Sequence, residues 1–195
     1  MGFFTKNDLS SKYVSFSKSQ QGYTRISESI LNSKPVDYFD IFLSHSYKDS
    51  IQIENLKLIL EEDFGYSVYV DWLEDNQLDR TKVTEEAANL LKKRMNQCKC
   101  LLFATSQNSS DSKWMPWELG YFDGIKPKKV AIIPVVEYSS SSFKGQEYLG
   151  LYPYIDKTRS ESTSKDILWV NNPNTFANFV SFGDWLNGTQ PYYRK

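Results

Sequence analysis

Apolar residues between positions 38 and 136 follow two alternating patterns. Short apolar runs of strand length occupy residues 39–44, 66–71, 100–105 and 129–136. Between them, apolar residues recur every three or four positions, as on one face of a helix. The first such segment has Ile53, Leu56, Leu60 and Phe64, and the second has Val83, Ala87, Leu90, Leu91, Met95 and Cys98. Strands that alternate with helices predict an α/β fold, with a parallel sheet covered by helices on both faces.

The pattern is weaker at both ends of the chain. Residues 1–36 are polar and rich in serine, and we expect a short helix at 25–31 before Pro35. Apolar positions between 176 and 186 predict a terminal helix that returns to the sheet. We therefore expect an N-terminal extension over 1–36 and one domain over 37–195, with its core at 38–136 and a C-terminal elaboration at 137–195.

Composition and charge argue against several classes of function. The chain has 195 residues and a net charge of −1, which gives no electrostatic basis for binding nucleic acid or an anionic membrane. Cys98 and Cys100 are the only cysteines and His45 is the only histidine, so neither a disulfide framework nor a metal site is expected. Neither a signal peptide nor an apolar span of roughly 20 residues is visible, and we expect a cytoplasmic protein.

The glycines match no common nucleotide-binding motif. They fall into neither the G-x-G-x-x-G spacing nor that of a P-loop. A doubly wound sheet without these motifs argues against a hydride-transfer dehydrogenase and against a P-loop enzyme. Any nucleotide would be held in another way.

The most informative local feature is an acid between aromatic residues. The segment reads Trp114, Met115, Pro116, Trp117 and Glu118, and it follows a polar stretch from 106 to 113. A carboxylate flanked by two indoles is partly shielded from water, and such shielding is one way in which proteins raise the reactivity of an acid. The plain alternative is a solvated acid in the first turn of a helix, where the helix dipole favours negative charge.

The order of the segments resembles the TIR domain family. The first strand ends in Leu43 and Ser44, the second in Val70 and Asp71, the third in Thr105 and Ser106, and the segment 112–119 follows. The aromatic segment and His45 are most similar to a bacterial TIR-like subgroup that includes the TIR protein of the Thoeris anti-phage system. The resemblance implies a flavodoxin-like sheet with strand order 2-1-3-4, a fifth element, and helices on both faces.

The resemblance also implies an activity. In the family, the glutamate four residues after the tryptophan cleaves NAD, and here that position is Glu118. In the Thoeris system, the TIR protein is understood to convert NAD into a cyclic ADP-ribose signal that activates a separate nucleotide-sensing effector. We therefore expect an NAD glycohydrolase or ADP-ribosyl cyclase that uses NAD as substrate, with no resident cofactor or metal and with possible homo-oligomers.

Other candidate site residues lie where the predicted strands end. Ser44, His45 and Ser46 follow the first strand, Tyr69 and Asp71 end the second, and Trp114 precedes the acid; all six are candidates for binding the substrate. A lone histidine such as His45 also fits a structural role. Tyr69 fits core packing and ligand stacking equally well.

Glu85 is a second candidate for the essential acid, because its helix begins after the loop that overhangs the pocket in TIR domains. An ordinary helix-start acid after the capping residue Thr84 is the alternative.

Two other functional hypotheses remain open. A TIR scaffold that only recruits other TIR domains would have no need of Glu118. A phosphate-accepting receiver domain shares the fold but needs clustered acids where this chain has Ser44, His45 and Ser46.

Overall fold

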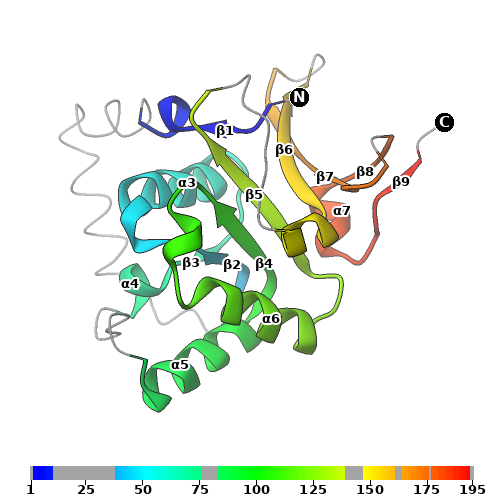
Figure 1. The fold of residues 1–195 in the computed structure, drawn as a ribbon. Coiled ribbons are helices and arrows are strands. Elements are labelled where there is room, and N and C mark those ends of the chain that lie inside the picture. The colour runs from blue at the N-terminus through cyan, green and yellow to red at the C-terminus, as the bar shows by residue number, and fades with distance from the viewer. Residues whose placement is uncertain are drawn as a thin grey trace.

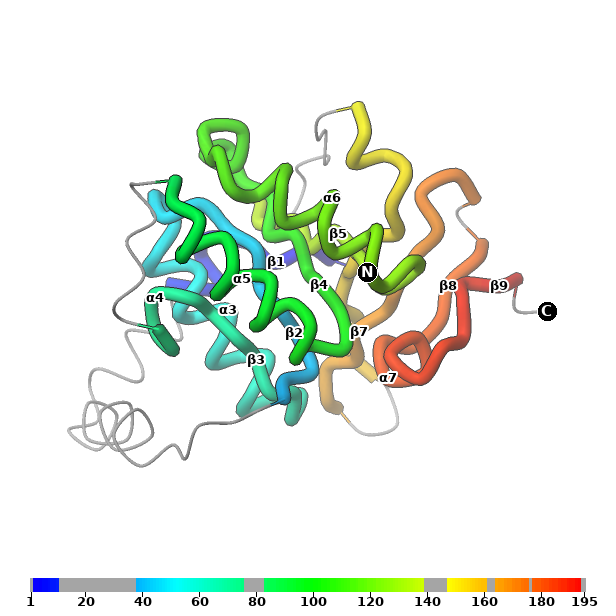
Figure 2. The backbone as a smooth tube through the Cα atoms, turned by 90° about the horizontal axis from the view of Figure 1, so that it is seen from below, coloured from blue at the N-terminus to red at the C-terminus, as the bar shows by residue number. Residues whose placement is uncertain are grey.

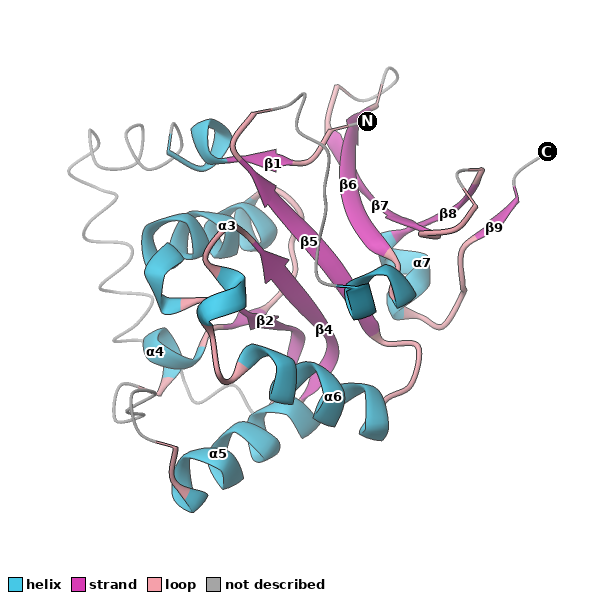
Figure 3. Cartoon of the chain, in the orientation of Figure 1, coloured by secondary structure: helices cyan, strands magenta, loops and turns pink. Residues whose placement is uncertain are grey.

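The computed structural model describes residues 2–10, 38–75, 83–138, 147–160, 164–175 and 177–193. Its centre is one mixed sheet with the strand order β3-β2-β4-β5-β6-β7-β8-β9 (Figure 1). The helices and strands of the core alternate along the chain (Figure 3). The α/β fold predicted from the sequence is confirmed.

The parallel part of the sheet has the predicted strand order. Its strands are β2 (Phe39–Ser44), β3 (Val68–Tyr69), β4 (Cys98–Thr105), β5 (Val130–Val136) and β6 (Tyr154–Arg159). All pairings from β3 to β6 are parallel. Counted from β2, this is the order 2-1-3-4 with β6 as the fifth element, and it brings the ends of β2 and β4 next to each other.

Helices cover both faces of this sheet. They are α3 (Ser50–Glu62), α4 (Asp71–Glu74), α5 (Glu85–Asn96) and α6 (Met115–Ile125), with short 3-10 turns η1 (Tyr47–Asp49), η2 (Ser109–Asp111) and η3 (Glu147–Leu151). The buried face of α3 packs into one hydrophobic cluster with Ile41 and Leu102, whereas α5 and α6 pack into a second with Phe42 and Phe103. Figure 2 shows α5 and α6 side by side. Alternate residues of β2 and β4 therefore point into opposite hydrophobic clusters.

Local sequence signals explain where two of these helices begin. The Thr84 side chain accepts a hydrogen bond from the Ala87 backbone N–H and caps α5. Pro116 lies in the first turn of α6, where its missing N–H is not needed. None of the described helices is both long enough and apolar enough to cross a membrane.

The first residues of the chain belong to the sheet. Strand β1 (Phe4–Thr5) pairs in parallel with the end of β5, where Phe4 lies opposite Val135. Gly2 forms an antiparallel bridge with Lys157 of β6. Because β5 and β6 pair directly only at Ile132 and Tyr154, β1 lies between them where they diverge. The helix expected at 25–31 lies outside the described residues.

The C-terminal region adds three antiparallel strands and a short helix. They are β7 (Asp166–Asn171), β8 (Asn178–Ser181), α7 (Phe182–Leu186) and β9 (Tyr192–Tyr193). The prediction of one terminal helix over 176–186 was wrong for its first half. Val180 points into the core while Phe179 packs edge-on against Trp169 on the other face, which is a two-residue period.

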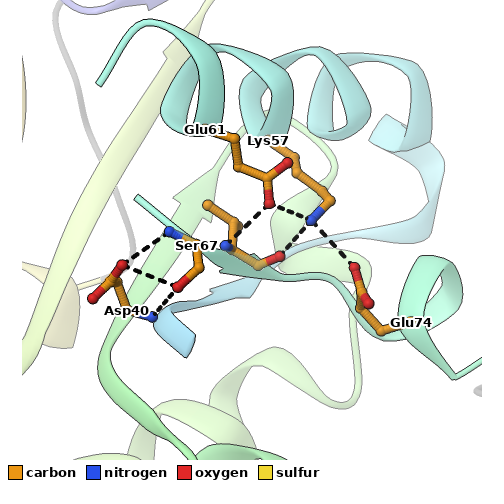
Figure 4. A network of polar contacts seen from close by, with 6 residues as sticks. Asp40, Lys57, Glu61, Ser67 and Glu74 are labelled. Atoms are coloured by element: carbon orange, nitrogen blue, oxygen red, sulfur yellow. Dashed lines mark hydrogen bonds and ion pairs between the residues drawn. The ribbon is translucent and has the colours of Figure 1, made fainter. Parts of the chain in front are cut away.

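A polar network joins α3 to the edge of the sheet (Figure 4). The Lys57 ammonium donates to Glu61 at 2.6 Å and to the Val68 carbonyl, and it lies 3.2 Å from Glu74 of α4. Asp40 accepts from the backbone N–H of Ser67 at 2.9 Å and from its hydroxyl at 3.0 Å. These contacts hold β3, a strand of only two residues, against its neighbours.

Replacing Lys57 by Met should destabilise the fold by about 1–3 kcal/mol, because it removes a largely buried cation that contacts two carboxylates and a carbonyl. Urea denaturation measures the change. Lys99→Met is the matched control, since Lys99 is 66% exposed and pairs with Asp40 on the surface, and it should cost at most about 1 kcal/mol. Equal losses in the two variants would contradict the structural role of Lys57.

Strand β6 carries a buried acid, Asp156. Among the described residues, its Oδ1 atom has no hydrogen-bond partner, and the same holds for the Oγ1 atom of Thr158 on the same face of the strand. Burial raises the pKa of the Asp156 carboxyl above its ordinary value, and a hydrogen bond from Asn171 offsets this only in part. The charged form of Asp156 is therefore less favourable in the folded protein than in the unfolded chain.

The raised pKa predicts a pH-dependent gain from Asp156→Asn. Below the unfolded pKa of about 3.9, Asp156 is protonated in both states and its ionisation costs nothing. As pH rises through that value toward the higher folded pKa, the unfolded chain ionises first, so the wild-type protein loses stability relative to the variant. Denaturation of both proteins from pH 3 to pH 7 should show a difference that grows with pH. A constant difference would contradict the prediction.

Candidate functional site

The candidate site lies at the carboxyl ends of β2 and β4, where the first turn of α6 meets them. The Glu118 backbone N–H donates to the Trp114 carbonyl at 2.8 Å, which begins the helical hydrogen bonding of α6. This turn directs the Glu118 side chain inward, where it has no exposed surface. A fully buried carboxylate needs hydrogen bonds or a positive partner to remain ionised.

Ser44 supplies one of these hydrogen bonds. Its hydroxyl donates to Glu118 Oε2 at 2.6 Å, and Ser44 is as fully buried as Glu118. The distance is typical of a hydroxyl bonded to a charged carboxylate. Two residues predicted separately from the sequence, one to bind substrate and one to act on it, are thus in direct contact.

His45 is held by hydrogen bonds at both ring nitrogens. The Trp72 indole N–H donates to His45 Nε2 at 3.1 Å, and His45 Nδ1 lies 2.9 Å from the Leu43 carbonyl. Because Nε2 accepts, we assign the proton to Nδ1, which gives a neutral imidazole that donates to Leu43. Asp71 lies close by, with Oδ1 3.7 Å from His45 Nε2. The structure thus brings His45 and Asp71 together in a buried network that links the ends of β2 and β3.

Tyr69 lies in the hydrophobic core. Its ring stacks on Phe42 with centroids 5.2 Å apart, and its hydroxyl donates to Asp75 at 2.7 Å. Arg94 donates to both oxygens of Asp75 at 2.8 Å. Burial acts to raise the pKa of Asp75, but the hydrogen bonds from Arg94 and Tyr69 outweigh it and lower that pKa. Of the two interpretations of Tyr69, the geometry favours core packing.

Aromatic residues form a row along α6. Trp114 is buried and packs edge-on against Trp117, with ring centroids 5.4 Å apart. Trp117 in turn stacks on Tyr121 at 5.7 Å, and the Lys92 ammonium of α5 lies 5.9 Å from the centre of the Tyr121 ring. The row therefore runs from the residue before α6 to its middle and ends at a cation of α5.

Asp49 joins the two loops that border the site, and the sequence analysis did not single it out. Ser46 leads from β2 into η1, and Asp49 is the last residue of η1. The buried Asp49 carboxylate accepts from the hydroxyl of Ser106 and, at 2.7 Å, from the Asn108 amide, both in the loop after β4. The sequence signal that could have revealed this contact is an acid five residues after one strand, together with a Ser-x-Asn sequence directly after another.

Glu85 lies apart from this arrangement. It is exposed in the first turn of α5 behind the cap Thr84, where the helix dipole favours an acid. The structure joins Ser44 to Glu118 and His45 to Asp71, but it does not bring Glu85 into either pair. The described residues contain no cluster of three or more histidine, cysteine or acidic side chains able to hold a metal ion.

Comparisons with known proteins agree with the fold. The model of the TIR domain family matches residues 41–168, and the chain belongs to this family. It is 47% identical over 194 residues to a Bacillus cereus (strain MSX-D12) protein named "Probable 3′ cyclic ADP-D-ribose synthase ThsB′", covering 95% of this chain and 98% of that protein. It is 38% identical over 98 residues to a Cytobacillus dafuensis protein, TIR2, named as a candidate cyclic ADP-D-ribose synthase, covering 50% of this chain and 25% of that protein.

Asp49→Ala should destabilise the fold by about 1–3 kcal/mol, because it removes the acceptor of two hydrogen bonds at a buried position. Asp111→Ala is the control, since Asp111 is 56% exposed and pairs with the exposed Lys48, and it should cost at most about 1 kcal/mol. Urea denaturation compares the two variants. A larger loss in Asp111→Ala would show that the buried contacts of Asp49 do not stabilise the loops.

Proposed function

We propose that this chain is a TIR enzyme of bacterial anti-phage defence that cleaves NAD and makes a cyclic ADP-ribose signal. The observation that carries the proposal is the 47% identity, over nearly the full length of both chains, to a protein named as a cyclic ADP-D-ribose synthase. The second relative bears the same kind of name. NAD is then a substrate, and no resident cofactor is part of the proposal.

The geometry around Glu118 is suited to this chemistry. Breaking the bond between nicotinamide and ribose leaves positive charge on the ribose, as in glycoside hydrolysis, and the bonding electrons leave with the nicotinamide. The leaving group is cationic in NAD and neutral after departure, so it needs no general acid. One negative carboxylate close to the ribosyl cation can stabilise it. We assign this role to Glu118, which Ser44 holds and tryptophans flank.

The nucleophile that attacks the ribosyl cation determines the product. Water yields linear ADP-ribose, whereas a group within the substrate itself closes a ring. Exclusion of water favours the second outcome, and the buried position of Glu118 and Trp114 supports such a dry site. Because Glu118 has no exposed surface, groups that cover it have to move before NAD can reach the carboxylate.

The proposed partners follow from the activity. They are NAD itself, a separate nucleotide-sensing effector reached through the released signal, and a second copy of this chain. Neither nucleic acid nor a membrane is among them. The chain carries a net charge of only −1, which agrees with a protein that acts through a small diffusible product.

Glu118→Gln should abolish signal production. Glutamine keeps the size of the side chain and an amide oxygen that can accept the Ser44 hydroxyl, but it removes the negative charge. Loss of such an electrostatic partner costs about 10²–10³ in rate. The test is incubation with NAD followed by chromatography of the products, using purified protein and extracts of phage-infected cells that contain it.

Glu85→Gln is the matched control, with the same chemical change at an exposed acid of α5, and it should retain activity. Loss of activity in Glu85→Gln together with full activity in Glu118→Gln would show that Glu85 is the essential acid. Full activity in both variants would show that neither acid is essential. An infected-cell extract that contains the wild-type protein and never yields an ADP-ribose product would support the scaffold alternative instead.

A further inference from the structure

The geometry points to Ser44 as a positioning residue that fixes the Glu118 carboxylate for reaction, rather than as a residue that binds NAD. The inference rests on the proposed function, because it specifies how the essential acid is held. It starts from the hydrogen bond of 2.6 Å between two side chains that are both fully buried.

Ser44 is well placed to hold another side chain still. It is the last residue of β2, which has a parallel neighbour on each side, and it lies opposite Phe103 of β4. A side chain on a central strand moves less than one on a loop, and a supporting residue on a rigid element keeps a reacting group in one orientation. Glu118 comes from a different element, the first turn of α6, so the bond also ties that turn to the sheet.

Nearby hydroxyl groups are engaged elsewhere. The Thr105 hydroxyl, at the end of the neighbouring strand β4, lies 3.3 Å from that of Ser109. The Ser106 hydroxyl donates to Asp49. Of the hydroxyls of Ser44, Thr105 and Ser106, the one directed at Glu118 is that of Ser44. Its single proton is already donated to the carboxylate and is not available to a ligand.

Two roles for Ser44 predict different kinetics. A residue that binds NAD contributes in the ground state, so its loss raises KM. A residue that orients Glu118 contributes only when charge develops on the ribose, so its loss lowers kcat and leaves KM nearly unchanged. A hydrogen bond to a charged group corresponds to about ten- to hundredfold in rate.

The experiment compares Ser44→Ala, which lacks the hydroxyl, with Ser44→Thr, which keeps it. We expect kcat with NAD to fall about ten- to hundredfold in Ser44→Ala, KM to stay within about twofold, and Ser44→Thr to recover part of kcat. Thr105→Val is the control, because it removes a buried hydroxyl from the neighbouring strand end without touching Glu118, and it should keep wild-type kinetics. A raised KM with unchanged kcat in Ser44→Ala would overturn the inference. So would a Ser44→Thr protein of wild-type Tm that is as slow as Ser44→Ala.

A stability measurement tests the same contact without any turnover. Ser44→Ala should lower Tm more in the wild-type background than in Glu118→Gln, because a charged carboxylate is a stronger acceptor than an amide. Equal shifts in the two backgrounds would mean that Ser44 does not hold Glu118. If the Tm shifts show this coupling but the wild-type protein yields no product from NAD, the proposed function is refuted, whereas the contact between Ser44 and Glu118 is supported.

Discussion

A parallel sheet that is buried on both faces leaves polar side chains few places other than the ends of its strands. In this chain, β2, β4 and β5 are apolar along nearly their whole length, and two hydrophobic clusters cover them. Hydroxyl, imidazole and carboxyl groups therefore gather at one edge. Within this set, the hydrogen bond between Ser44 and Glu118 joins segments 74 residues apart.

The sequence predicted the central strands because their apolar runs are long and uninterrupted. It also placed Ser44 and Glu118 at the same edge, since parallel strands end together and α6 follows β4. It could not predict that the two side chains touch, because this depends on the register between β2 and β4 and on the rotation of α6. The same limit applied to Tyr69, whose ring and hydroxyl are directed by Phe42, Asp75 and Arg94.

The missed elements are short or have mixed patterns. Strands β1 and β9 contain two residues each, too few to show any period. In the region of β8 and α7, a strand with Val180 inward is followed at once by a helix that buries Phe182 and Trp185. The combined apolar positions imitate a single helix. Only pairing with β7, a tertiary contact, separates the two elements.

The position of β1 between β5 and β6 affects the order in which the molecule can assemble. Phe4 pairs with Val135 and Gly2 with Lys157, so these contacts close loops of more than 130 residues. Contacts between such distant segments form slowly, because the chain entropy is lost before the pairing is gained. Until β5 and β6 are in place, Phe4 has no core to enter, and its insertion is expected to be a late step of folding that closes the sheet.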